Sequence, residues 1–267
     1  MKKIIIGIFT LTTLVGCQEV INLDLNSANP YLVIDATIDD KAEADTVKIT
    51  KTVGLDQGVS DLRGVVGARV TLSDDAGNSE VLLENSAGKY LTNTMAKGVP
   101  GRTYTLAVVA EGKTYTSICK MPIPVHFDTL VTIPSAGFGP PNPNLRVPVP
   151  IYRDPIGEKN FYRFIRTIRD TSESNFIIRD DVLTNGLLVR NPVNSFGGKR
   201  LLVGDKLKLT MLCIDEAVYN YLRTVNTNSG GGMGASATPQ NPISNFEGGC
   251  LGYFSAQSAQ ERTIIAF

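Results

Sequence analysis

The amino-acid sequence contains one histidine, His126, and this limits the chemistry that the chain can perform. A Ser–His–Asp triad or a His-ligated metal would have to use it. His126 follows Pro124-Val125 and precedes Phe127-Asp128 in an apparent strand, which is typical of a structural histidine. Cys119 precedes it at no metal-ligand or catalytic spacing, and no serine stands in a Gly-x-Ser-x-Gly frame. We therefore predict no catalytic residue, no metal site and no cofactor, and expect a protein that is not an enzyme.

Pairs of adjacent aspartates are the next candidates for chemistry, and they occur at Asp39-Asp40, Asp74-Asp75 and Asp180-Asp181. Loop carboxylates with nearby carbonyl groups can hold calcium, but none of these pairs follows the Asp-x-Asp-x-Asp-Gly order of an EF-hand loop. Turn formation is the ordinary role of such aspartates. A carboxylate-dependent hydrolase stays an alternative, because two acids that are distant in the sequence leave no local mark.

Two stretches are rich in glycine. Gly230 to Gly234 lacks the Gly-Lys-Ser/Thr of a phosphate loop and is interpreted as a flexible loop. The second stretch lies near the C-terminus, where glycines adjoin aromatic residues. It is either a packing device that needs positive φ angles or a binding platform. The platform would consist of Asn245, Gly248, Gly249, Tyr253 and Phe254.

The N-terminal residues form a recognisable export signal. Two lysines follow Met1, the apolar run Ile4 to Val15 is too short to span a bilayer, and Leu14-Val15-Gly16-Cys17 resembles the bacterial lipobox. This arrangement predicts that residues 1–16 are a lipoprotein signal peptide and that Cys17 is acylated, for example with palmitate. Residues 17–29 would then be a tether, and the acyl chains would hold the protein on a membrane.

Acylation of Cys17 would leave three thiols, Cys119, Cys213 and Cys250. Cys213 and Cys250 share the C-terminal half and could form a disulfide in the oxidising cell envelope. The alternative is three buried thiols that pack as small apolar side chains.

Composition excludes some classes of function. The 267 residues carry 26 basic and 26 acidic side chains, and loss of Lys2 and Lys3 with the signal peptide leaves 24 basic ones, a net charge of −2. A slightly acidic chain is not a binder of the nucleic-acid backbone. The apolar content of 42% is enough to build real cores.

The pattern of residues 30–123 predicts an antiparallel β-sandwich, Ig-like or transthyretin-like. In Leu32 to Ile38 the even-numbered residues are apolar, while Asp35 and Thr37 point away from that face. About seven short runs of this kind alternate with turns such as Asp75 to Asn78 and Glu111 to Lys113.

Residues 124–267 predict a second β-rich domain with one short helix. The proline-rich segment 134–150 is expected to be a surface loop or an extended edge, and Lys206 to Ile214 alternates as a strand does. Asp215 is a good N-cap for a helix that runs to Asn226. The Gly-, Ser- and Asn-rich segment 226–236 is expected to be a loop.

Several short motifs occur in a characteristic order after the lipobox. They are Pro30-Tyr31-Leu32-Val33-Ile34-Asp35-Ala36, Gly67-Ala68-Arg69-Val70, Gly88-Lys89-Tyr90, Gly101-Arg102-Thr103-Tyr104-Thr105-Leu106, Gly112-Lys113-Thr114-Tyr115 and the segment Pro242 to Phe254. Over nearly the whole mature chain the sequence resembles the Bacteroidota lipoproteins grouped as domain-of-unknown-function family 4249 (DUF4249). The family has no established catalytic or binding residues that could be carried over to this chain.

The resemblance implies an outer-membrane accessory lipoprotein, of a kind often associated with TonB-dependent nutrient transporters. The leading hypothesis is therefore a non-enzymatic binding or accessory module, anchored through Cys17, whose ligand is unknown and whose partner is such a transporter. The alternative is a surface adhesin or an envelope-structural lipoprotein. The sequence leaves open which face of the outer membrane the protein occupies.

Overall fold

The computed structural model describes residues 30–53, 63–95, 97–135, 142–195, 197–228 and 241–267. The expected signal peptide, Cys17 and the tether lie outside these residues, as does most of the expected loop 226–236. The predicted fold class is confirmed, because the chain is mainly β with one helix among the described residues. No helix in the described part is long and apolar enough to cross a membrane.

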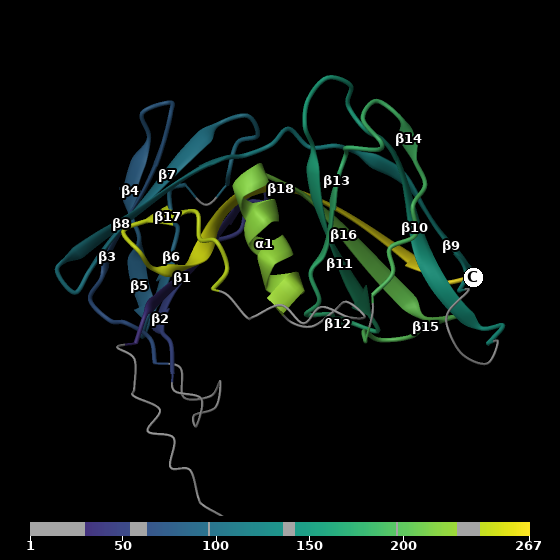
Figure 1. Cartoon of the computed structure of the whole chain (residues 1–267), viewed down its shortest axis with the longest axis horizontal. Coiled ribbons are helices and arrows are strands. Elements are labelled where there is room, and N and C mark those ends of the chain that lie inside the picture. The colour runs from purple at the N-terminus through teal and green to yellow at the C-terminus, as the bar shows by residue number, and fades with distance from the viewer. Residues whose placement is uncertain (1–29, 54–62, 96, 136–141, 196, 229–240) are drawn as a thin grey trace, which may run out of the picture.

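Period-two alternation produces the first sandwich, most of which is purple and blue in Figure 1, while β17 and β18 are yellow. Along β1 the side chains of Leu32, Ile34, Ala36 and Ile38 are buried and the intervening ones are not, so that one face of the sheet joins a core. One layer of this sandwich pairs five strands in order, β17 (Phe246–Glu247), β8 (Lys113–Lys120), β7 (Thr103–Ala110), β3 (Arg69–Asp74) and β4 (Ser79–Val81). The facing layer consists of part of β18 (Leu251–Ile265) with β1 (Leu32–Asp39), β2 (Thr46–Lys51), β6 (Lys89–Leu91) and β5 (Leu83–Ser86).

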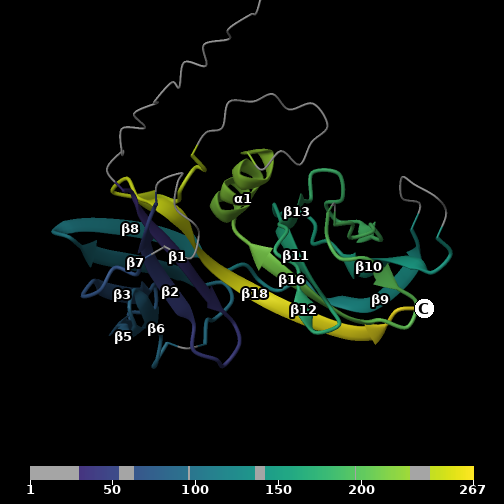
Figure 2. The same ribbon diagram turned by 90° about the horizontal axis from the view of Figure 1, so that it is seen from below.

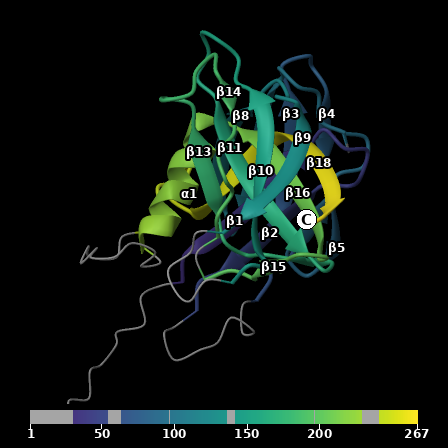
Figure 3. The ribbon, with the colours of Figure 1, turned by 90° about the vertical axis from the view of Figure 1, so that its right-hand side faces the viewer.

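The second β unit contains its own apolar core around Phe127, Phe164 and Leu209. One layer continues the sheet of β18 through β16 (Lys206–Ile214) and β11 (Phe161–Ile168), to which β12 (Thr171–Ser172) and β13 (Ile177–Asp180) pair. The other layer consists of β14 (Leu188–Val189), β10 (Leu145–Arg153) and β15 (Leu201–Leu202), with β9 (Phe127–Pro134) pairing to β10. Figure 3 shows β9 and β10 in front of β16 and β11.

The long strand β18 joins the two units. Its first part, Leu251 to Gln257, pairs in parallel with β1, and its second part, Ser258 to Ile265, pairs antiparallel with β16. Figure 2 shows this strand, in yellow, running across the molecule from one β unit to the other. Residues 30–123 therefore do not complete the first sandwich by themselves, because β17 and the first part of β18 belong to it. This parallel pairing covers an edge of β1 that would otherwise expose unpaired backbone groups.

The expected proline-rich segment 134–150, interpreted as a surface loop or an extended edge, is extended over residues 145–150, which belong to β10, while its residues 136–141 lie outside the described part of the chain. Pro148 and Pro150 lie inside this strand and pair with Thr132 and Leu130 of β9. The carbonyl of Pro148 accepts a hydrogen bond from the Val193 amide (2.8 Å), so it points away from β9. The proline nitrogens, which carry no hydrogen, lie on this same side of the strand. On that side β14 and β15 pair only with the two ends of β10, and the missing N–H groups break no ladder.

The predicted helix is present as α1 (Glu216–Asn228). The Asp215 carboxylate accepts a hydrogen bond from the Val218 amide (2.8 Å), as an N-cap does. The helix extends two residues beyond Asn226, so residues 226–228 are helical and not part of a loop. The Asn226 side-chain amide donates to the Phe176 carbonyl (2.8 Å), and this bond holds the end of α1 against the segment before β13.

Candidate functional site

A groove lies where α1 passes the outer face of β18, β1 and β2; Figure 1 shows the helix standing between the two β units. The groove has a volume of about 390 Å³, at the small end of the range for ligand sites. We call it the α1 groove. Its lining residues come from strands, from α1 and from the segment before β13: Asp35, Ala36, Thr37, Thr46, Lys48, Phe176, Tyr221, Val225 and Tyr253.

Strand register builds the floor of the α1 groove. Asp35 pairs with Tyr253 on one side and with Lys48 on the other, so the three side chains form one row across β18, β1 and β2. Thr37 and Thr46 lie two residues away from Asp35 and Lys48 along their strands, and therefore on the same face. The floor presents an aromatic ring, a carboxylate, an ammonium group and two hydroxyls.

Aromatic side chains form the walls. The rings of Tyr221 and Tyr253 lie 4.8 Å apart between centroids and are tilted by 33°, which fixes a residue of α1 against a residue of the floor. Phe176 carries the Arg163 guanidinium over its ring at 4.9 Å. Arg163 also donates to the Tyr253 hydroxyl (3.4 Å), so contacts within the protein hold all three rings in place.

The two charged groups on the floor, Asp35 and Lys48, are not engaged by other described side chains. Neither Asp35 nor Lys48 makes a hydrogen bond or a close ion pair within the described chain, although they face each other across β1 and β2. Desolvation by the surrounding walls raises the pKa of the Asp35 carboxyl, and the Lys48 charge opposes this. Desolvation, with contributions from Asp35 and Tyr253, also raises the pKa of Tyr221 to about 12. The Asp35 side chain is exposed in the groove, and its carboxylate is therefore open to a ligand.

Of the five residues of the expected C-terminal platform, only Tyr253 lines the α1 groove. Phe254 is fully buried in the core. Asn245 is occupied by the backbone of Phe254, because its side chain accepts from the Phe254 amide (2.9 Å) and donates to the Phe254 carbonyl (2.7 Å). Gly248 and Gly249 have positive φ angles in the turn between β17 and β18, and Gly248 lies close to the backbone of β8. These four residues shape the chain rather than a common binding surface.

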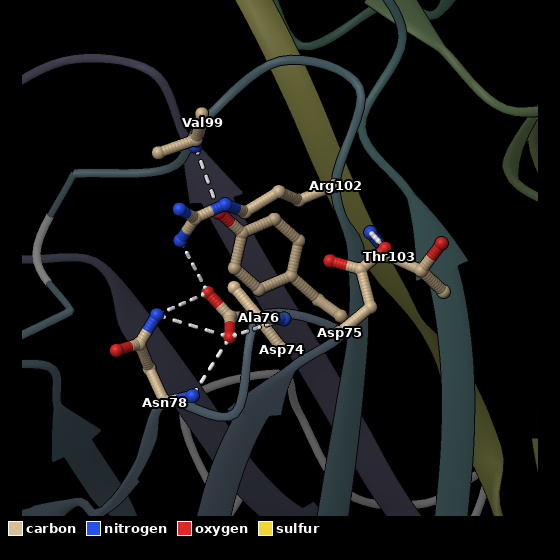
Figure 4. Close-up of polar contacts among 8 residues, drawn as sticks. Asp74, Asp75, Ala76, Asn78, Val99, Arg102 and Thr103 are labelled. Atoms are coloured by element: carbon tan, nitrogen blue, oxygen red, sulfur yellow. Dashed lines mark hydrogen bonds and ion pairs between the residues drawn. The ribbon is translucent and has the colours of Figure 1, made fainter.

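The aspartate pairs form local structure, and Asp74 is the clearest case (Figure 4). Its carboxylate accepts from the Ala76 amide (3.1 Å), from the amide and side chain of Asn78 (2.9 Å each), and from Arg102 (2.6 Å). Asp75 accepts from the Thr103 amide (3.0 Å). These contacts tie the β3–β4 turn to the start of β7, as expected of turn-forming aspartates.

The other two pairs are also engaged in contacts within the protein. Asp40 accepts from the Ala259 amide (2.8 Å), and Asp180 accepts from the Tyr219 hydroxyl (3.0 Å). His126 contacts the side-chain amide of Gln260. In the described part of the chain, no group of three or more His, Cys, Asp or Glu side chains could hold a metal ion.

We expect Asp74→Ala to lower the free energy of unfolding by about 3 kcal/mol, because it leaves several donors without a charged acceptor. Desolvation raises the pKa of Asp74, but hydrogen bonds from Asn78, Arg102 and Ala76 outweigh it, and the folded-state pKa lies below the ordinary value. The carboxylate therefore stabilises the fold above its unfolded-state pKa, and this contribution is lost as the pH falls through its folded-state pKa.

Urea unfolding of wild type and Asp74→Ala between neutral pH and about pH 2 measures this effect. The difference between the two proteins should shrink toward the acid end. Asp75→Ala, which loses a single backbone contact, is the matched control and should cost about 1 kcal/mol. A difference between wild type and Asp74→Ala that is independent of pH would contradict the assigned role of the carboxylate.

The expected disulfide between Cys213 and Cys250 is wrong. Cys119, Cys213 and Cys250 are all free and buried. Cys213 pairs with Ser258 of β18, whereas Cys250 precedes the first residue of the same strand. Eight residues of extended chain separate Ser258 from Cys250, a distance of about 26 Å, and a disulfide requires Cα atoms within about 7 Å. The thiols behave as small apolar side chains in two different cores.

Sequence reasoning missed most of the α1 groove. It placed Asp35 and Thr37 on the outer face of their strand but gave that face no role, and it did not single out Lys48, Phe176 or Tyr221. No local signal could have joined them, because these residues come from segments that are distant in the sequence. The outward carboxylate inside an apolar strand was the one available sign.

Comparison with known proteins identifies a family and finds likenesses to solved structures. The model of a family described as "Domain of unknown function (DUF4249)" matches residues 18–263. No curated protein matches the chain. A solved two fibronectin type-III domain segment from chicken tenascin is 14% identical, covers 70% of this chain and 91% of its own, and superposes with a TM-score of 0.21.

Proposed function

The chain belongs to the DUF4249 family, and from this premise we propose that it is a lipid-anchored, non-enzymatic binding module of the outer membrane that works beside a TonB-dependent nutrient transporter. The observation that carries the binding role is the α1 groove, in which two charged groups without hydrogen-bond partners among the described residues lie beside aromatic walls. Concave sites with apolar walls and a few converging polar groups are typical of ligand recognition.

The groove supports binding better than hydrolysis. Paired-carboxylate hydrolysis of glycosides needs two acids that face each other across the scissile bond. The described lining offers one carboxylate, Asp35, and places an ammonium group rather than a second acid next to it. Its aromatic walls are held by Arg163 and α1, which suits a preformed binding surface.

A second surface supports a protein partner. Ile156, Val182, Leu183 and Leu187 are between 56% and 88% exposed at one end of the second β unit, and we call them the aliphatic tip. Asn185 joins the two loops that carry them, because its side chain accepts from the Gly157 amide (3.0 Å) and donates to the Glu158 carbonyl (3.2 Å). Exposed apolar clusters on an ordered support are typical of interaction sites.

The membrane location is supported by the lipobox that ends at Cys17. The chain would be acylated there, and the protein would stay attached to the outer membrane while its tether leaves the groove and the aliphatic tip accessible. The alternative role of an adhesin or structural lipoprotein would use the same anchor but would require exposure on the cell surface. Protection of the whole chain from protease on intact cells would remove that alternative.

Immunoprecipitation from native membranes, with palmitate labelling, tests the proposal. We expect wild type to carry label and to recover an outer-membrane barrel protein. Cys17→Ala should carry no label and recover none. Leu183→Glu should lose the barrel, whereas Ile118→Glu, at another exposed apolar position on β8, should retain it. A labelled wild-type chain that is always recovered alone would contradict the accessory role.

A further inference from the structure

The floor of the α1 groove selects against a charged ligand. Asp35 and Lys48 are opposite in charge, lie directly across from each other, and are without other partners in the described chain. A ligand that carries a net charge would be attracted by one group and repelled by its neighbour. A neutral ligand that can donate a hydrogen bond to the carboxylate and accept one from the ammonium group would use both.

Neighbouring hydroxyl groups on one ring meet this requirement, because each hydroxyl can donate and accept. The hydroxyls of Thr37 and Thr46 extend the polar row on the same face and can join either role. A ligand with several hydroxyls at fixed spacing therefore matches the floor better than one with a single polar group.

The walls require the same ligand to have an apolar face. Tyr253 lies next to Asp35 at the end of the polar row, and the Tyr221 ring packs on the Tyr253 ring at 4.8 Å. The polar row is therefore bordered by this pair of aromatic rings. Phe176, held by Arg163, adds a further aromatic surface. A saturated ring with hydroxyls at its rim and C–H groups on one face can contact the pair of aromatic rings and the polar row at the same time.

From these observations, and resting on the binding role proposed above, we infer that the α1 groove binds a neutral carbohydrate, with one sugar ring against Tyr253 and Tyr221 and neighbouring hydroxyls shared between Asp35 and Lys48. The volume of about 390 Å³ suits a small saccharide or one unit of a longer chain. Because the rings and strands are already in place, little ordering is required when the ligand binds.

The test uses the full acylated chain in detergent on an array of neutral oligosaccharides, with sulfated and uronic-acid oligosaccharides and peptides as competing classes. We expect retention on a neutral oligosaccharide. Its affinity should fall at least about tenfold in Asp35→Asn, Lys48→Gln and Tyr253→Ala, the loss of one good contact. Tyr253→Phe keeps the ring but loses the contact between Arg163 and the Tyr253 hydroxyl, and should lose less affinity than Tyr253→Ala.

The matched control is a second Asp–Lys pair away from the groove. Asp170 and Lys206 form an exposed ion pair (2.9 Å), and Asp170→Asn with Lys206→Gln should bind as wild type does. Equal unfolding midpoints for all variants show that the losses are not losses of fold. Affinity should also fall on acidification, starting at a higher pH than for an unperturbed aspartate, because burial raises the pKa of Asp35.

The inference is overturned if no neutral oligosaccharide is retained at millimolar concentration, if the groove variants bind as wild type does, or if a charged oligosaccharide or a peptide occupies the groove. If the protein recovers a barrel partner from membranes but binds no neutral oligosaccharide, the proposed function stands and only the inferred ligand class is wrong. If it binds a neutral glycan through the groove but recovers no barrel protein, the ligand class stands and the proposed transporter partner is wrong.

Discussion

Gly252→Ala is expected to lower the free energy of unfolding by more than about 4 kcal/mol, or to prevent folding altogether. Gly252 pairs with Ile34 where β18 runs parallel to β1. A Cβ atom at this position would lie 2.0 Å from the Ile34 carbonyl oxygen, and the residue has a φ of +94°. The Ile34 carbonyl belongs to the backbone of β1 and cannot move aside as the end of a flexible side chain can. Strand β18 would therefore have to move away from β1 and open the core beneath it.

Gly249→Ala provides the matched control three residues earlier. Gly249 also has a positive φ, of +77°, but the nearest atom to an added Cβ is the Lys113 ammonium nitrogen at 3.9 Å. Only the backbone strain applies there, and it should cost about 1–2 kcal/mol. Equilibrium unfolding in urea compares the two variants, and equal losses would show that contact between β18 and β1 is not what requires glycine at position 252.

The second large effect concerns residues 30–123 in isolation, which are expected not to form a cooperative fold. Their core includes Phe254 and Ala256 from β18, and also Leu212 and Leu222 from β16 and α1. Cys119 accepts a hydrogen bond from the Ala256 amide (3.1 Å) and is buried by that contact. Removing the C-terminal segment would leave these apolar surfaces of β1 and β8 in water.

Thiol labelling of Cys119 measures this directly, because it is the single cysteine of the fragment. The thiol should react at the rate of an unfolded chain in the fragment and be protected in the full chain. Burial raises the pKa of this thiol, which adds to its protection in the folded state. A fragment with a protected thiol and a cooperative unfolding transition would show that residues 30–123 are an independent domain.

Much of the β structure could be predicted because it is local. Alternating residues in Leu32 to Ile38 and in Lys206 to Ile214 identify strands and their buried faces, and the turn at Glu111-Gly112 identifies the β7–β8 hairpin. Asp215 indicates the start of α1 for the same reason, since a cap bonds to residues within one turn. These features depend on neighbours a few residues away.

The pairing of β1 with β18 could not be predicted, because it joins opposite ends of the chain and no turn fixes its register. This pairing places Tyr253 beside Asp35, so the α1 groove could not be predicted for the same reason. The sequence showed a tyrosine near glycines and an outward aspartate in an apolar strand as separate features. The prolines of β10 left a loop and an extended edge as alternatives, since a strand tolerates proline where its N–H position needs no ladder partner.

Hydrogen exchange of the full acylated chain, with and without the neutral oligosaccharide that the array retains, tests the central claim most directly. The account predicts that slowed exchange is confined to peptides of β1, β2, α1 and the first part of β18, which build the α1 groove. The sheet of β3, β7 and β8 and the aliphatic tip should exchange at unchanged rates. Slowed exchange at the tip or on the β7–β8 sheet, or none in the groove strands, would contradict the claim that the α1 groove is the binding site.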